Sequence, residues 1–167
     1  MSRQESQVFY YLLRSPVGQL LLVGDHQALG RLQFQDGKHP QAIDPQWKKA
    51  RQPFETVISQ LEHYFKGRLT KFTVKLSPEG TDFQQKVWKA LRTIQYGTTV
   101  SYGEIATRIG NPHASRAVGA ANGQNPISII VPCHRVIGAN GKLVGYGGGL
   151  PIKQSLLELE HRAVAPR

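Results

Sequence analysis

The residues of this chain best suited to covalent chemistry are the neighbours Cys133, His134 and Arg135. Cys133 is the single cysteine, and it follows Pro132 directly after the apolar run 127–131, which predicts a strand. The thiolate is the reactive form of cysteine, and nearby positive charge lowers the pKa of a thiol. The sequence therefore predicts that His134 and Arg135 make Cys133 a nucleophile at neutral pH. The alternative is an inert buried thiol, because free cysteine is among the most buried residue types.

Composition narrows the class of protein. One cysteine cannot form an internal disulfide or supply the paired thiolates of a zinc finger or an iron–sulfur cluster. We expect no metal and no cofactor. The chain has 21 Lys and Arg residues against 11 Asp and Glu residues, a formal net charge of +10. This excess predicts a polyanionic partner, with nucleic acid as the first candidate and a generally solvated basic surface as the alternative. The polar N-terminus and the lack of a stretch of ~20 apolar residues predict a cytoplasmic protein that does not bind membranes.

The residues before a composition change at 77–80 predict a small sheet covered by a helix. The predicted strands are 8–13, 20–23, 29–34 and 72–76. A helix with an apolar stripe at i, i+3, i+4 and i+7 is predicted after Pro53 and ends at Gly67. No catalytic cluster is apparent in this half, and we interpret Trp47 and the other aromatic residues as core or interdomain packing.

The residues after the break predict helices and a helix-turn-helix. Thr81–Gln84 and Ser101–Glu104 match the capping-box pattern, which predicts that a helix begins at each. A third helix is predicted over 112–123, after Asn111 as N-cap. Small residues dominate this helix, and Arg116 is its one long charged side chain, which suits a nucleic-acid groove. Close packing against another helix is the alternative interpretation.

The last part of the chain predicts a hairpin, a glycine-rich loop and a final helix. Asn140–Gly141 between two apolar pairs is a strong hairpin signal. The glycine-rich segment 145–149 lacks the endings of a phosphate loop and of a dinucleotide fingerprint, so we reject both. Its backbone N–H groups are expected to approach a flat ligand. The final helix starts at Pro151 and carries Glu160, a candidate buried or half-buried acid that composition alone predicts to be a surface residue.

Several short segments together carry a family resemblance. They are Ser101–Gly103, Arg116–Gly119, Asn125–Pro126, Pro132–Gly138 and Tyr146–Gly149. In this order they resemble the O6-alkylguanine-DNA alkyltransferases, also called methylated-DNA–protein-cysteine methyltransferases, and the layout is similar to the stand-alone bacterial form. The resemblance implies an α+β fold. Residues 1–77 would form an antiparallel sheet with a helix, similar to ribonuclease H, and residues 78–167 a helical domain with a winged helix-turn-helix.

The resemblance also implies the reaction. An alkyl group, chiefly methyl, would move from O6 of guanine, and from O4 of thymine, in DNA to Cys133. The transfer would be irreversible and stoichiometric, so each molecule would act once. His134 would deprotonate the thiol through a water, Glu160 would orient the imidazole, and Asn125 would brace the network.

The remaining site residues follow from the same resemblance. The damaged base would be flipped out of double-stranded DNA, and Arg116 would fill the space that it leaves. Tyr102, Val136 and Gly147 would form the substrate pocket, and Tyr102 would also press on the flanking phosphate. Gln84, Gly103 and Asn111 would contact the DNA backbone. The protein is expected to be a monomer.

Two other classes explain part of the sequence. A non-catalytic helix-turn-helix regulator with Cys133 as a redox sensor accounts for the charge and the helices, but leaves Asn125 and Glu160 unexplained. A cysteine hydrolase accounts for Cys133 and His134. Hydrolases, however, usually bring these two residue types together from distant parts of the chain, and adjacent side chains after a strand tend to point apart.

Overall fold

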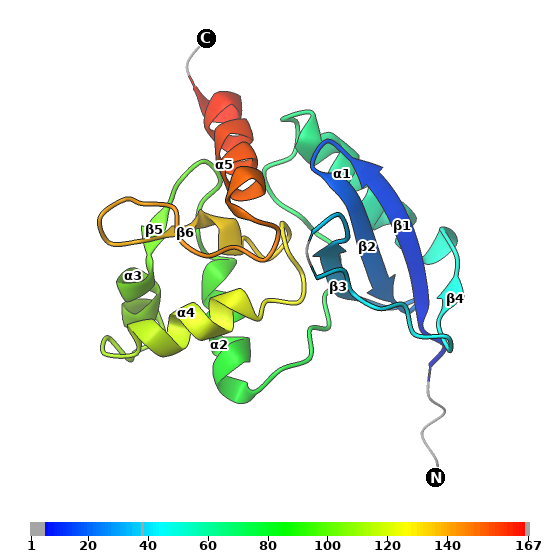
Figure 1. Cartoon of the computed structure of the whole chain (residues 1–167), viewed down its shortest axis with the longest axis horizontal. Helices are drawn as coiled ribbons and strands as arrows, with labels where there is room; N and C mark the ends of the chain where they lie inside the picture. Colours follow the sequence, from blue (N-terminus) through cyan, green and yellow to red (C-terminus); the bar gives the residue numbers. More distant parts are fainter. Residues whose placement is uncertain (1–5, 38, 166–167) are drawn as a thin grey trace.

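The N-terminal half is built on a four-stranded sheet (Figure 1). The structure, a computed structural model, describes residues 6–37 and 39–165, so the polar residues 1–5 lie outside it. The strands are β1 (Phe9–Ser15), β2 (Gly18–Gly24), β3 (Leu29–Phe34) and β4 (Lys48–Lys49), in the order β3-β2-β1-β4. The first three are antiparallel neighbours, and β4 is parallel to β1. Gly18, with a φ of 97°, ends the tight turn between β1 and β2.

Helix α1 (Glu55–Phe65) covers one face of this sheet, after a 3-10 turn η1 (Gln52–Phe54) (Figure 1). Its buried residues are Val57, Ile58, Leu61 and Tyr64. These residues recur at helical spacing and share one apolar core with Leu20 and Leu22 of β2. The predicted strands 8–13, 20–23 and 29–34 and the predicted helix are therefore confirmed, with small shifts at their ends.

The C-terminal half consists mainly of helices (Figure 1). They are α2 (Asp82–Leu91), α3 (Tyr102–Arg108), α4 (Ser115–Gly123) and α5 (Leu150–Val164). A short parallel pair, β5 (Val100–Ser101) and β6 (Val136–Ile137), lies beside α3. The capping box of α2 is confirmed, because Thr81 Oγ1 accepts from Gln84 N and Gln84 Oε1 accepts from Thr81 N. Ser101 Oγ likewise accepts from Glu104 N at 3.1 Å and caps α3.

Helix α4 begins three residues later than predicted. Ala114 N donates to Asn111 O, and Asn111 N donates to Ala106 O. The residues that the sequence assigns to the first turn of α4 therefore close the connection between α3 and α4. Asn111 belongs to this tight turn, and Ala114 is the residue before the helix.

The prediction of a strand over 127–131 is wrong. Only Ile127 forms a bridge, with Leu32 of β3. The chain then turns at Ile129, whose φ is 72°, and Val131 N donates back to Ile127 O at 3.0 Å. The four apolar residues of this run are buried, so its composition reflects burial in a folded-back segment and not a strand.

Two further predictions are only partly right. Segment 72–76 runs alongside β3 but forms a single bridge, between Leu29 and Leu76. The turn at Asn140–Gly141 exists, because Gly138 N donates to Lys142 O, yet no strand follows it. In the predicted hairpin, residues 136–137 would have paired with residues 143–144. In the structure they pair with β5.

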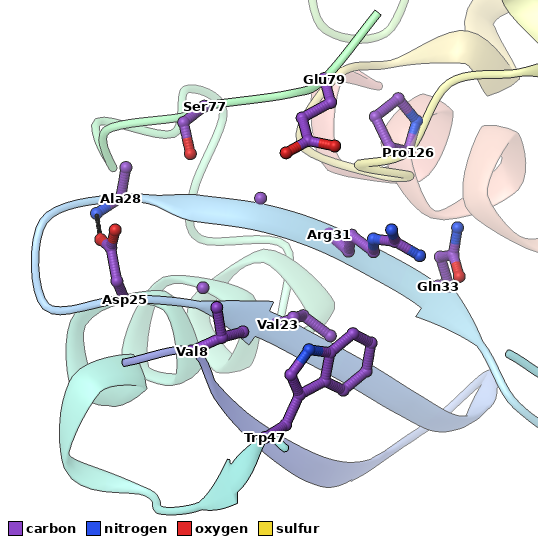
Figure 2. Close-up of a pocket in the computed structure, with 12 residues that line it drawn as sticks. Val8, Val23, Asp25, Ala28, Arg31, Gln33, Trp47, Ser77, Glu79 and Pro126 are labelled. Atoms are coloured by element: carbon purple, nitrogen blue, oxygen red, sulfur yellow. Dashed lines mark hydrogen bonds between the residues drawn. The ribbon is translucent and has the colours of Figure 1, made fainter. Parts of the chain in front are cut away.

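The free edge of β3 joins the two halves of the molecule. Leu32 N donates to Pro126 O at 2.9 Å, and Ser128 N donates to Leu32 O at 3.0 Å. Figure 2 shows a pocket of about 380 Å³ nearby, lined by the sheet, by Ser77 and Glu79, and by Pro126. None of the predicted site residues lines this pocket. Within the described residues, no helix is long and apolar enough to cross a membrane.

Candidate active site

Cys133 begins the short 3-10 turn η2 (Cys133–Arg135) and is 4% exposed. The buried Asn125 holds the segment that leads to it. Asn125 Nδ2 donates to Val131 O at 2.9 Å and to Ile127 O at 3.3 Å, and Asn125 Oδ1 accepts from Ile127 N at 3.0 Å. A side-chain amide thus replaces the strand partners that this backbone lacks. Asn125 thereby fixes the turn that presents the cysteine.

The resting form of Cys133 is the neutral thiol. Burial raises the pKa of the thiol, and the opposing effects of an Asn125 hydrogen bond and the Lys153 charge do not overcome it. The prediction that His134 and Arg135 lower this pKa is therefore wrong, because both side chains are directed to Glu160. A base is consequently needed at the moment of reaction.

His134 and Glu160 form a buried pair that supplies such a base. His134 Nε2 and Glu160 Oε2 are 2.6 Å apart, and the two side chains are 0% and 1% exposed. Burial raises the pKa of Glu160, but the hydrogen bond from His134 and the hydrogen bonds and charge of Arg135 outweigh it and lower the pKa to about 2. An ionised carboxylate only accepts, so the hydrogen between the two groups belongs to Nε2.

The second ring nitrogen of His134 is consequently free of hydrogen. Burial lowers the pKa of His134, which keeps the imidazole neutral, and a neutral imidazole protonated at Nε2 has a lone pair at Nδ1. Among the described residues, Nδ1 has no hydrogen-bond partner. His134 is therefore a neutral base that the Glu160 carboxylate holds in place, and it is the residue next to the buried thiol of Cys133.

Sequence reasoning did not predict two further hydrogen-bond partners of Glu160, although it had singled out one of them, Arg135, for another role. Arg135 Nε donates to Glu160 Oε1 at 2.7 Å, and Tyr64 Oη of α1 donates to Glu160 Oε2 at 2.6 Å. Tyr64 lies seven residues after Val57 on the buried stripe of α1, so a polar tip on an apolar stripe was the available signal. Its partner in α5 could not be identified from spacing.

Lys153 of α5 was also missed, although it is fully buried. Its Nζ donates to Val136 O at 2.6 Å and to Val144 O at 2.9 Å. It thereby joins α5 to both sides of the turn 138–142, next to the loop that carries Gly147. The spacing of Lys153, Leu156 and Glu160 at i, i+3 and i+7 was the signal in the sequence, because it places charged residues on the buried stripe.

Two of the predicted pocket residues, Tyr102 and Val136, lie in segments joined through the β5–β6 pair that follows the Cys133 turn. Tyr102 begins α3, and an added Cβ at Gly119 of α4 would lie 3.8 Å from its ring. Burial raises the pKa of Tyr102, and its Oη donates to Val144 O at 3.5 Å. Val136 is fully buried beside η2, whereas Gly147 is exposed in the glycine-rich loop. Helix α3 follows β5, which pairs with β6 directly after the Cys133 turn, and Asn122 Nδ2 of α4 donates to Cys133 O at 3.5 Å.

The predicted DNA contacts are distributed over α2, α3 and α4. Arg116 is exposed on α4, Asn111 is exposed in the turn before it, and Gly103 lies in the first turn of α3. Gln84 is half-buried, and its side chain is occupied by the capping box of α2. Within 6–37 and 39–165, no group of three or more His, Cys, Asp or Glu side chains is placed to hold a metal ion.

Comparison with known proteins places this geometry in a family. Residues 8–78 match the ribonuclease-like domain of the 6-O-methylguanine DNA methyltransferases, and residues 82–162 match their DNA-binding domain. A methylated-DNA–protein-cysteine methyltransferase of Methanosarcina acetivorans is 55% identical over 153 residues, which are 92% of this chain and 98% of that protein. One of Mycobacterium tuberculosis is 54% identical over 156 residues, 92% of each chain.

Solved structures agree with this assignment. The crystal structure of Mycobacterium tuberculosis OGT in complex with DNA has a TM-score of 0.87 and 54% identity, and the match covers 93% of this chain and 94% of that one. The Mycobacterium tuberculosis O6-methylguanine methyltransferase has the same TM-score at 52% identity, covering 96% of this chain and 97% of that one.

A sheet-and-helix half joined to a helix-turn-helix half around a buried Cys–His–Glu site defines a protein-cysteine alkyltransferase. The chain belongs to the family of 6-O-methylguanine DNA methyltransferases, the methylated-DNA–protein-cysteine methyltransferases. The resemblance inferred from the sequence and the α+β fold that it implied are thereby confirmed. Membership also favours the alkyl-acceptor interpretation over a redox-sensing regulator or a cysteine hydrolase.

Proposed function

We propose that this protein repairs alkylated DNA by moving a methyl group from O6 of guanine to Cys133. The observation that carries the proposal is the buried His134–Glu160 pair, which occupies Nε2 of the imidazole and leaves Nδ1 without a hydrogen-bond partner among the described residues. This is the arrangement of an activated nucleophile, a thiol with a neutral base and an acid that orients the base. The family match of both halves supports the substrate class.

The transfer is a single displacement. The thiol proton of Cys133 moves, through a water, to His134 Nδ1, and the sulfur attacks the methyl carbon. The S–C bond forms while the C–O6 bond breaks, and the electron pair of that bond stays on the guanine. Tyr102 donates a hydrogen bond to the departing base, which takes one proton from water and leaves neutral. His134 later returns the former thiol proton to water, so atoms and charge balance. The new S–C bond on Cys133 is not cleaved again, so each protein molecule acts once.

The DNA is engaged by the C-terminal half. We assign residues 1–77 to a structural domain and residues 78–167 to the domain that binds DNA and accepts the alkyl group. The two family matches, over 8–78 and 82–162, support this division.

Arg116, exposed on the slender α4, enters the stack where the damaged base is flipped out. Gln84, Gly103 and Asn111 contact the DNA backbone, an assignment that rests on the family resemblance alone. O4-alkylthymine is a second substrate, and the protein acts as a cytoplasmic monomer.

Intact-protein mass measures the proposed transfer directly. Mixing the protein with duplex DNA that contains O6-methylguanine should add one methyl group per chain, and peptide mapping should locate it at Cys133. Cys133→Ala should still bind the duplex and gain no mass, which is the matched control. Repeated turnover from a small amount of protein, or methylation at another residue, would contradict the proposal.

A further inference from the structure

Tyr64 of α1 contacts the acid of the site directly. Its hydroxyl donates to Glu160 Oε2 at 2.6 Å, although the two residues are 96 positions apart in the sequence. Both side chains are buried, so solvent does not compete for this hydrogen bond. Burial, and then the Glu160 charge, raise the pKa of the Tyr64 phenol well above its usual value. The phenol therefore remains protonated and acts as a donor.

The same carboxylate oxygen holds His134. Glu160 Oε2 accepts from His134 Nε2 at 2.6 Å and from Arg135 Nη2 at 3.1 Å, in addition to Tyr64. Each further donor draws electron density from Oε2 and weakens its attraction for the His134 hydrogen. That attraction determines how readily Nδ1 takes up a proton, because the carboxylate stabilises the imidazolium that forms. Tyr64 is thus placed to influence the base without touching the substrate.

Neighbouring aromatic rings fix the position of Tyr64. The ring centroids of Phe65, Phe72 and Tyr96 lie 5.3, 5.5 and 6.3 Å from that of Tyr64. Tyr96 also lies over the guanidinium of Arg135, at 5.5 Å. Within the described part of the chain, however, the buried Tyr96 hydroxyl has no hydrogen-bond partner. Tyr64 and Tyr96 are therefore a matched pair of neighbouring tyrosines, one bound to the carboxylate and one not.

We propose that Tyr64 is a positioning residue for alkyl transfer, which fixes the Glu160 carboxylate and shares the oxygen that holds His134. The inference rests on the proposed function of Cys133 as the acceptor. It gives the N-terminal half, which contains no residue of the reacting centre, a direct part in the chemistry of the C-terminal half. The side chain of α1 completes a network whose other members come from η2 and α5.

The control variant for Tyr64→Phe is Tyr96→Phe. Apart from position 96 in the control, both variants keep all the other ionisable groups around His134 and Glu160. These groups are Arg135 and Cys133 of η2, Lys153 of α5, and the phenols of Tyr96 and Tyr146. Replacement of Tyr64 by phenylalanine keeps the ring and removes only the donor. Without it, Glu160 attracts the His134 hydrogen more strongly, so the pKa of His134 rises.

The test compares Tyr64→Phe with Tyr96→Phe in the full chain. The first-order rate of methyl transfer at saturating duplex is measured against pH. In Tyr64→Phe we expect the acidic midpoint of this profile to move up by about half a unit to one unit, and the rate at neutral pH to fall by up to about threefold. Affinity for duplex DNA should not change. Tyr96→Phe should behave as the unmodified protein.

Nitrogen-15 NMR of His134 in the DNA-free protein provides a second readout. Its pKa should be higher in Tyr64→Phe and unchanged in Tyr96→Phe. A native His134 titration and pH profile in Tyr64→Phe, or an equal shift in Tyr96→Phe, would overturn the inference. If Tyr64→Phe does not fold, ring-fluorinated tyrosine is placed at position 64 alone. It is a stronger donor, so the pKa of His134 should fall in this otherwise unmodified chain. An unchanged pKa of His134 would contradict the inference. Because this titration needs no substrate, its outcome is separate from whether Cys133 accepts a methyl group.

Discussion

At the scale of single residues, burial determines which groups react. Cys133 is a protonated thiol because it is buried, and His134 is a neutral base for the same reason. The sequence pointed to Cys133 through its uniqueness and its neighbours. It could not show that Glu160 is buried, since composition alone made this residue a surface acid. Only the family resemblance connected Glu160 with His134, and no sequence signal placed Arg135 on the same carboxylate.

Glu160→Gln should change how stability depends on pH. The pKa of Glu160 is about 2 in the folded protein, below the ordinary ~4.3 of an unfolded glutamate. The folded state therefore binds fewer protons, and the resulting stabilisation is present above ~4.3 and is lost as the pH falls through about 2. The glutamine variant lacks this component. It also leaves Arg135 buried without its carboxylate, which should cost about 3–5 kcal/mol at neutral pH.

Urea unfolding at a series of pH values measures both effects. Glu158→Gln, an exposed position on the same helix, is the control and should remain close to the unmodified protein. The interpretation fails if Glu160→Gln and the unmodified protein lose stability equally between pH ~4.3 and ~2, or if the glutamine variant is as stable at neutral pH.

At the scale of elements, local signals were predictable and long-range partners were not. The caps of α2 and α3 follow from two or three neighbouring residues, so Thr81 and Ser101 were identified from the sequence. The segment 127–131 was assigned to a strand because it is apolar. Its backbone is satisfied by β3, by turns and by Asn125, and these partners are specified by tertiary structure. The turn 111–114 shortened α4 for a similar reason.

Arg116→Ala should separate base flipping from the transfer step. Helix α4 presents Arg116 to solvent, away from the Glu160 network. Its loss should slow methyl transfer from duplex DNA far more than transfer from a free O6-alkylguanine base, because only the duplex requires the extruded base to be replaced. The two rates are measured with the same preparation, so the free base is an internal control. Equal losses on both substrates would indicate a defect of the pocket or the fold instead.

At the scale of the whole molecule, the acceptor site is held from both halves. Pro126 and Ser128, on the segment before Cys133, are hydrogen-bonded to β3, and Tyr64 of α1 reaches Glu160. A close-packed interior transmits displacement instead of absorbing it. A change of volume at Cys133 should therefore affect the contacts that join the two halves, and not only the immediate pocket.

Alkylated protein should be less stable than the unmodified protein. A methyl group on Cys133 adds volume to a side chain that is 4% exposed, and it removes the thiol's capacity to donate a hydrogen bond. Overpacking of this kind typically costs ~1–3 kcal/mol. The methylated form should accordingly melt at a lower temperature, and protease should cut it faster, because the segment 126–128 separates from β3 more readily. Cys133→Ala, which removes volume at the same position, distinguishes overpacking from the mere loss of the thiol and should not show the same increase in cleavage between the halves. A methylated form that melts at or above the temperature of the free protein would refute the idea, and the transfer chemistry would be unaffected by that result.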